Sequence, residues 1–103
     1  MFEILITEEF ENDFNKLDKS LKTRIGKVIE QLKTSPYAGK PLGYPFFREK
    51  KIGKYRLYYL IYKEFLVVFM IAVSEKKDQQ ATINSINRLI PFYREEVRKR
   101  FTK

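Results

Sequence analysis

Residues 46–73 read FFREKKIGKYRLYYLIYKEFLVVFMIAV, and this stretch decides the fold. Residues 46–52 are basic and partly alternating, which predicts a strand, and Gly53 offers a turn or bulge position. Residues 54–63 alternate between two faces, and we expect the face without charge in the core. That face carries Tyr55, Leu57, Tyr59 and Ile61. Residues 65–73 are apolar on both faces, which predicts a central strand that returns antiparallel after a short connection.

The chain before this stretch predicts a strand and two helices. Residues 2–7 are β-branched and apolar, as in a strand. Thr7 is a suitable N-cap for a helix over 8–17, whose apolar residues recur at helical spacing. A polar break at 18–20 precedes a second apolar stripe over 20–34. Two helices joined this tightly are expected to form an antiparallel hairpin.

The remaining segments are loops and a C-terminal helix. Residues 35–45 hold three Pro and two Gly, which is typical of a loop, and 74–78 is a polar loop. Apolar residues then step by three and four to the end of the chain. We expect a helix over about 78–89, a kink or break at Pro91, and a second piece to about 101 that packs on the body.

Length and composition predict one domain, over 1–103, with 89–103 as a C-terminal helical extension. The chain has 103 residues, 44% of them hydrophobic, with nine Phe and seven Tyr, enough for one core. It has no Cys and no His, which removes the commonest zinc ligands, thiol nucleophiles and histidine-based catalysis, so we expect no metal and no cofactor. The longest apolar run, Phe65 to Val73, is too short to span a membrane, and the first residues lack the basic start and long apolar stretch expected of a signal peptide. We expect a soluble, cytoplasmic protein without a membrane partner.

The charge is unevenly placed. The formal net charge is +8, and residues 45–56 alone carry five basic residues against one acid. A concentrated basic excess favours a polyanion, most often nucleic acid, as partner. The competing interpretation is that Lys and Arg only solubilise an aromatic-rich domain or protect a sheet edge from pairing.

If residues 46–56 form two adjacent strands, several cations project from one sheet face beside Tyr58 and Tyr62. Such a face suits unpaired RNA, with charges for phosphates and rings for stacked bases. It also suits RNA cleavage by the 2′-OH, with an arginine on the phosphate and a lysine of lowered pKa as base or acid. Glu49 is the alternative base, although a salt bridge to a neighbouring lysine is its simpler role. Without His, such an enzyme is expected to depend on something else to orient the RNA.

The order of elements resembles the RelE/ParE toxin superfamily over roughly residues 2–88. The residues that carry the resemblance are Phe14-Asn15-Lys16-Leu17, Gly39-Lys40-Pro41-Leu42, Ile52-Gly53-Lys54-Tyr55-Arg56-Leu57-Tyr58-Tyr59 and Ile71-Ala72-Val73-Ser74. The resemblance implies an α+β fold: a small antiparallel sheet with the N-terminal helical hairpin on one face, a cationic cleft on the other, and a C-terminal helix. It also implies a toxin of a type II toxin–antitoxin pair, with a cognate antitoxin as partner.

Carried over by position, the resemblance assigns catalytic roles to three residues. Arg56 contacts the scissile phosphate, Lys51 acts as base or phosphate contact, and Lys76 protonates the leaving group. RNA contacts are expected from five further residues: Arg48, Lys50, Lys54, Lys77 and Tyr58. The chain departs from the pattern at Glu49, where many RelE-like enzymes have lysine, and at residues 79–82, which lack their tyrosine.

Three functions follow as alternatives. The first is a ribosome-dependent, metal-independent mRNA endonuclease. The second is a ParE-like toxin that inhibits DNA gyrase without nuclease activity. The third is a non-toxic RNA-binding domain. The departures at Glu49 and 79–82 keep the second alternative open.

Overall fold

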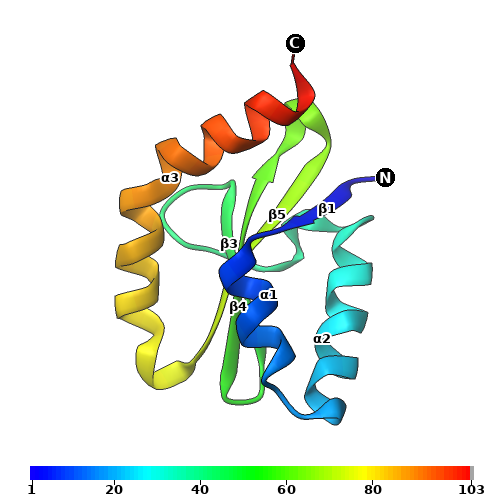
Figure 1. Ribbon diagram of the computed structural model, residues 1–103, viewed down its shortest axis with the longest axis vertical. Coiled ribbons are helices and arrows are strands. Elements are labelled where there is room, and N and C mark those ends of the chain that lie inside the picture. The colour runs from blue at the N-terminus through cyan, green and yellow to red at the C-terminus, as the bar shows by residue number, and fades with distance from the viewer. Residues whose placement is uncertain (103) are drawn as a thin grey trace.

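The computed structural model describes residues 1–102, which form an α+β fold as predicted (Figure 1). The strands and helices follow in chain order: β1 (Glu3–Ile6), α1 (Glu8–Asn15), α2 (Lys19–Leu32), β2 (Lys40–Pro41), β3 (Phe47–Ile52), β4 (Tyr55–Tyr62), β5 (Val67–Glu75) and α3 (Gln79–Phe101). Short 3-10 turns at Pro36–Ala38, Lys63–Phe65 and Lys76–Asp78 connect them.

The five strands form one sheet in the order β1-β5-β4-β3-β2. The pairs β2–β3, β3–β4 and β4–β5 are antiparallel, the last two as predicted for the stretch from 46 to 73. Strand β1 joins the sheet beside β5 and runs parallel to it. The sheet is therefore mixed, and β5 is an interior strand, which explains its apolar residues on both faces.

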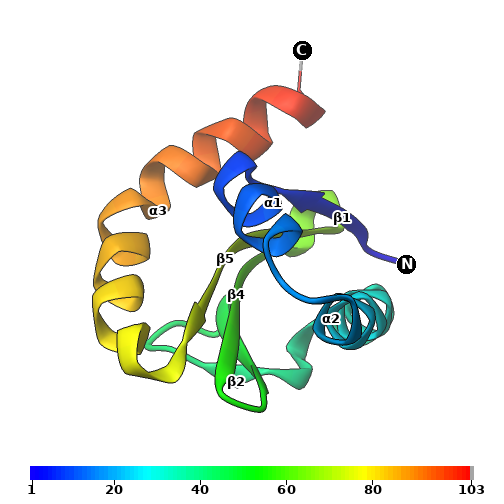
Figure 2. The same cartoon turned by 60° about the horizontal axis from the view of Figure 1, so that its bottom comes forward.

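Helix α1 begins at the predicted cap, and α2 begins within the predicted polar break. The Thr7 hydroxyl accepts a hydrogen bond from the Phe10 N–H at 3.0 Å and donates one to the Ile71 carbonyl at 2.7 Å. The Asp18 carboxylate accepts from the Leu21 N–H at 2.8 Å and starts α2. The two helices lie on one face of the sheet (Figure 2). The core between them contains Phe10, Leu21, Ile25 and Leu32 against Leu57, Tyr59, Ile61, Val68 and Met70.

Helix α3 covers most of the opposite face, where an open cationic cleft was expected. Its apolar stripe makes a second core with Phe47, Tyr58, Leu60, Tyr62, Val67, Phe69, Ile71, Ile86, Tyr93 and Val97. The prediction that the tail packs on the body is confirmed. The cationic cleft expected on this face is confined to one end of it, because the even-numbered residues of β4 are as buried as the odd-numbered ones. Only the end of the face beyond the start of α3 stays open.

Of the kink or break predicted at Pro91, the break is absent, because α3 is one helix of 23 residues with Pro91 inside it. A proline removes one backbone hydrogen bond and crowds the preceding turn, which bends a helix. Figure 1 shows that α3 changes direction along its length. Pro91 is exposed, so the bend curves the helix around the sheet without disturbing the core.

The Pro/Gly-rich loop is pinned to the sheet by Tyr59. The Tyr59 hydroxyl donates to the Pro36 carbonyl at 2.8 Å and accepts from the Gly39 N–H at 3.0 Å. A Cβ atom at Gly39 would lie 2.6 Å from both the Glu49 carbonyl oxygen and the Tyr59 hydroxyl. Only glycine lets the loop approach β3 this closely, and the approach forms the short strand β2, which the sequence analysis treated as loop.

Replacing Tyr59 by Phe is expected to lower the unfolding free energy by about 2–3 kcal/mol, because two buried backbone groups lose their partner. Tyr62→Phe is the matched control. The Tyr62 hydroxyl is buried and has no hydrogen-bond partner among residues 1–102. Its removal is expected to raise the unfolding free energy by about 1 kcal/mol. Urea unfolding followed by circular dichroism measures both changes, and equal losses in the two variants would contradict this account.

The stability is expected to fall steeply in alkali. Burial raises the pKa of Tyr58, Tyr59, Tyr62 and Tyr93. Above pH 10 the unfolded chain loses phenolic protons that the folded chain keeps. The unfolding free energy then decreases by up to about 1.4 kcal/mol per pH unit for each of these tyrosines. Urea titrations between pH 9 and 11 test this, and Tyr62→Phe should flatten the slope.

Candidate active-site cleft

Two rows of side chains lie side by side at the open end of the sheet. Register pairs Lys40 with Glu49 and Glu49 with Tyr58 across β2, β3 and β4. Residues that are direct partners in register point to the same face of a sheet. This row therefore lies on the face that α3 covers further along.

The second row pairs Lys51 with Arg56 and Arg56 with Ser74, across β3, β4 and β5. The two rows, the loop at 38–40 and the first residue of α3 enclose a cleft of about 460 Å³. Its lining residues are Ala38, Gly39, Lys40, Glu49, Lys50, Lys51, Arg56 and Gln79. The structure thus brings Arg56 and Lys51 together, as the sequence predicted, and adds one buried carboxylate.

Arg56 is almost completely buried, with 5% of its surface exposed. Its Nη1 atom donates to the Gly53 and Tyr55 carbonyl oxygens, each at 3.0 Å. No acidic side chain among residues 1–102 forms an ion pair with it within 4.0 Å. A guanidinium stays charged at any physiological pH, so Arg56 brings a positive charge to the cleft.

Glu49 is equally buried, at 6% exposure, and also has no ion-pair partner among the described residues. The expected salt bridge to a neighbouring lysine is therefore wrong. Its Oε1 atom accepts a hydrogen bond from Gln79 Nε2 at 2.5 Å. A buried carboxylate without a cationic partner is costly unless it is hydrogen-bonded, and it is a common feature of sites that move protons.

Tyr58 does not offer a ring for base stacking, contrary to the expectation from the sequence. Its ring is fully buried in the core under α3. Its hydroxyl lies 2.9 Å from Ser74 Oγ at the floor of the site. Burial raises the pKa of Tyr58, and the Glu49 charge raises it further, while Arg56 lowers it. Tyr62 is buried as well, so neither ring can stack a nucleotide.

Arg48, one of the expected RNA contacts, is hydrogen-bonded to the loop. Its Nε donates to the Pro45 carbonyl at 2.8 Å, and its Nη1 donates to the Tyr37 and Gly39 carbonyls at 3.0 and 2.8 Å. The guanidinium also lies over the Tyr37 ring, 5.0 Å from its centroid. The alternation of β3 puts Arg48 on the face opposite Glu49, so it braces the cleft wall from behind.

Lys54, Lys76 and Lys77 lie on a neighbouring surface, around Glu75 at the end of β5. Lys54 Nζ is 3.2 Å from Glu75 Oε1, and this hydrogen bond raises the pKa of Lys54. Lys77 Nζ lies 3.9 Å from Glu75 Oε2. Lys76 is exposed there and does not line the cleft that holds Arg56 and Lys51.

Two residues of the cleft were missed by the sequence analysis. Lys40 was assigned to the loop, because a two-residue strand that ends in proline has no period to detect. Gln79 was mentioned only as one of the residues 79–82, which lack the tyrosine of many RelE-like enzymes. The signal that could have found Lys40 was the preceding Gly39, since a close approach of the backbone brings the next side chain onto the sheet.

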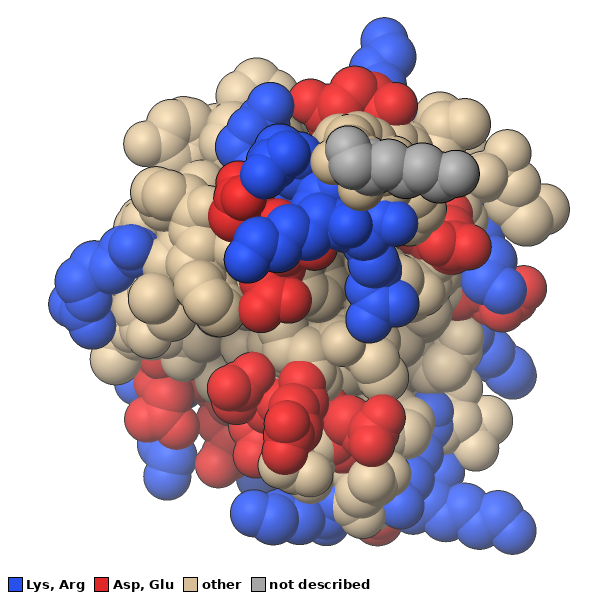
Figure 3. All heavy atoms as spheres, turned by 45° about the horizontal axis from the view of Figure 1, so that its top comes forward, with Lys and Arg blue, Asp and Glu red and all other residues tan. Residues whose placement is uncertain are grey.

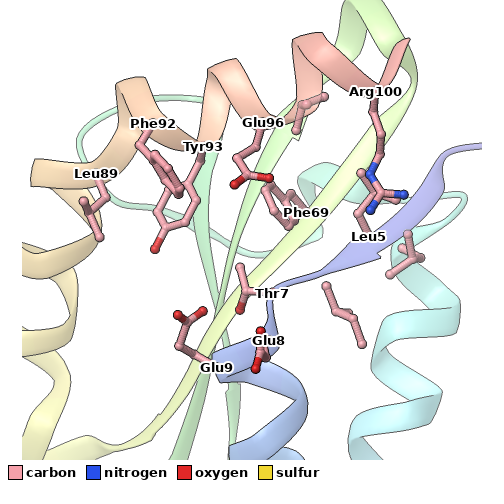
Figure 4. A pocket seen from close by; sticks show the side chains of 13 residues that line it. Leu5, Thr7, Glu8, Glu9, Phe69, Leu89, Phe92, Tyr93, Glu96 and Arg100 are labelled. Carbon is pink, nitrogen blue, oxygen red and sulfur yellow. The ribbon is translucent and has the colours of Figure 1, made fainter.

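A second and larger hollow, about 560 Å³, lies at the other end of the molecule, between β1, the start of α1 and the C-terminal half of α3. Figure 3 shows basic side chains gathered over the end of α3 and acidic ones over the start of α1, with uncharged residues between them. Close by, Glu8 and Glu9 face Leu89, Phe92 and Glu96 across this groove (Figure 4). Charges of both signs and exposed apolar residues around one groove suit a protein contact better than a phosphate backbone, which Glu8, Glu9 and Glu96 would repel.

The described residues include no helix with the length and hydropathy needed to cross a membrane. Within the same part of the chain, no three or more carboxylate side chains are grouped so as to hold a metal ion.

Comparisons with known proteins place these features in a family. A family model described as "ParE toxin of type II toxin-antitoxin system, parDE" matches residues 4–80. In sequence, no curated protein matches the chain.

Solved structures of RelE toxins share the fold. The toxin of the intact Escherichia coli RelBE complex is 26% identical, with a TM-score of 0.66 over 73% of this chain and 96% of that one. A mutant of E. coli RelE in the free state is 24% identical, with a TM-score of 0.72 over 85% of this chain and 97% of that one. The RelBE2 complex of Mycobacterium tuberculosis gives 24% identity and a TM-score of 0.64 over 72% and 90%.

Proposed function

The chain belongs to the ParE toxins of type II toxin–antitoxin systems, in the RelE/ParE superfamily, and we propose that it cleaves mRNA on the translating ribosome. The observation that carries the proposal is the cleft itself. It holds a buried arginine and a buried carboxylate that have no ion-pair partners among residues 1–102, with lysines beside them. A non-catalytic binding surface has no need of a buried, unpaired carboxylate among cations that meet RNA.

The residues fit cleavage by the RNA's own 2′-OH. Glu49 takes the proton from the 2′-oxygen, which attacks the adjacent phosphorus while the bond to the 5′-oxygen breaks. Arg56 and Lys51, which face each other across β3 and β4, stabilise the charge that develops on the phosphate oxygens. The products are a 2′,3′-cyclic phosphate and a free 5′-OH, once the leaving oxygen has received a proton.

The proton donor to the leaving oxygen is proposed to be Lys76. If the RNA continues from the cleft across the turn at 76–78, the leaving oxygen would lie near the ammonium group of Lys76. Lys54 and Lys77 lie on the same surface and would bind flanking phosphates. Lys40 and Lys50 would do so at the cleft itself.

Dependence on the ribosome is supported by what the cleft offers. It presents charge for a phosphate, while Tyr58 and Tyr62 present no ring for a base. Stacking on aromatic rings is the usual way in which a protein holds single-stranded RNA in place. We therefore propose that the ribosome orients the message and that the toxin supplies the catalytic groups.

Inhibition of DNA gyrase is the second candidate, because the matching family model is that of ParE toxins. A gyrase inhibitor would use the same surfaces for protein contacts and would leave messages intact.

A cognate antitoxin is the proposed protein partner. Solved relatives include RelB–RelE complexes from E. coli, Pyrococcus horikoshii and Methanococcus jannaschii. The groove at β1 exposes Ile6, Leu89 and Phe92 together, which suits a protein partner with apolar and basic side chains.

The test compares the two activities with one preparation of the protein. Message 5′ ends are mapped in a reconstituted translation reaction, with and without an initiation inhibitor, and gyrase supercoiling is assayed in parallel. We expect cuts within translated codons that require initiation, with gyrase unaffected. Inhibited supercoiling with intact messages would replace the proposal by the second candidate.

A further inference from the structure

We infer that Gln79 is a positioning residue that fixes the Glu49 carboxylate for proton abstraction, an inference that rests on the proposed endonuclease function. Gln79 is the first residue of α3, and its Nε2 atom reaches across to β3 to donate to Glu49 Oε1 at 2.5 Å. The contact joins residues 30 apart in the chain and closes one side of the cleft.

The hydrogen bond leaves the second carboxylate oxygen free. Glu49 Oε2 accepts no hydrogen bond from the described residues. It is also not among their fully enclosed polar atoms that lack a partner, of which the Tyr62 hydroxyl is the single case. Oε2 is therefore open to the cleft, while Oε1 is held. A carboxylate base that is held at one oxygen and free at the other can point its free oxygen at the 2′-hydroxyl of the RNA.

An amide is suited to this position because it carries no charge. Charged or titratable groups already surround Glu49 on each packed element: Lys40 on β2, Lys51 on β3, Arg56 and Tyr58 on β4, and Asp78 before α3. A further cation would bind the carboxylate as an ion pair and reduce its tendency to accept a proton. Gln79 fixes the geometry without adding a charge.

The alternative is that Gln79 only ties the start of α3 to the sheet. The helix begins without a side-chain cap, so the tie could serve stability alone. If the contact were only structural, its loss would lower the unfolding free energy but would not change how the cleavage rate depends on pH. The pH–rate profile therefore separates a positioning role from a structural one.

The experiment measures single-turnover cleavage on programmed ribosomes between pH 5 and 9. The variants are Gln79→Ala, which removes the donor, and Gln79→Lys, which keeps a donor but adds a charge. Gln80→Ala is the matched control, because the Gln80 amide bonds to Asn84 within α3, away from the cleft.

Gln79→Ala is expected to slow cleavage about 10–100-fold, the usual effect of losing one hydrogen bond to a charged group. The half-saturating ribosome concentration should stay unchanged. The acidic limb of the profile should move to higher pH, because the donor that favours the ionised carboxylate is gone. Gln79→Lys should move that limb to lower pH, and Gln80→Ala should match the wild type.

A wild-type rate and profile for Gln79→Ala would overturn the inference and leave the proposed function standing. The same loss in Gln80→Ala would overturn it as well. A wild-type protein that cleaves no message would overturn the proposed function. In that case, side-chain amide NMR signals decide whether the contact exists. Exchange protection of the Gln79 amide that disappears in Glu49→Ala supports the contact, and an amide unaffected by that change refutes it.

Discussion

Replacing Arg56 by alanine is expected to reduce single-turnover mRNA cleavage by about 100–1,000-fold, the usual effect of removing one group that stabilises transition-state charge. Arg56 supplies a positive charge that forms no ion pair with a described acid within 4.0 Å, at a position where burial strengthens its field. The loss should appear in the rate of the bound complex, with ribosome affinity little changed. Rapid-quench kinetics on programmed ribosomes measure both quantities.

Two further variants keep this prediction falsifiable, because a buried arginine also supports the fold. Arg56→Lys keeps the charge but loses the planar guanidinium with its paired N–H donors. Its cleavage rate should lie between those of Arg56→Ala and the wild type. Arg98→Ala removes an exposed arginine that pairs with Glu95 at the far end of α3, and it should cleave as wild type does. Circular dichroism identifies any variant that unfolds. Full activity in folded Arg56→Ala would remove Arg56 from the mechanism.

Replacing Glu49 by glutamine is expected to slow cleavage by about 100–10,000-fold, the range typical of a lost general base. The substitution keeps the size and planarity of the side chain, so the cleft should keep its shape. It removes the group that accepts the 2′ proton, and added base in the buffer should restore little because the site is buried. The pH–rate profile should also lose its acidic limb.

Glu64→Gln is the matched control, because Glu64 is a half-exposed glutamate that pairs with Arg94 far from the cleft. It should leave both the rate and the profile unchanged. If Glu49→Gln cleaves within about threefold of the wild type, the proton acceptor lies elsewhere, and Lys51 becomes the next candidate.

The fold was largely predictable because its signals are local. Thr7 and Asp18 cap their helices as their side-chain chemistry indicates, and the apolar residues of β5 identify an interior strand. The parallel pairing of β1 was not predictable, because it joins segments more than sixty residues apart and leaves no periodic trace.

The site was predictable only in part, because burial depends on what covers a face. The alternation of β4 put Arg56 and Tyr58 on one face correctly, but the sequence did not show that α3 buries the Tyr58 ring and leaves the Arg56 end open. Arg48 and Lys51 are both basic residues of β3. Only the strand register shows that Arg48 bonds to the loop and that Lys51 lines the cleft. Gln79 could be assigned to the site only once the position of the start of α3 relative to β3 was known.

The tight turn between β3 and β4 makes the site sensitive to chain length. Ile52 and Tyr55 are register partners, so the turn has two residues, with Gly53 first at a φ of +56°. One inserted or deleted residue here would shift β3 against β4 and exchange the faces of Lys50 and Lys51. Glu49 would leave the cleft, although every amino acid of the site was still present. A single-residue insertion or deletion in this turn would therefore remove the site. An insertion of two residues would keep each side chain of β3 on its present face of the sheet.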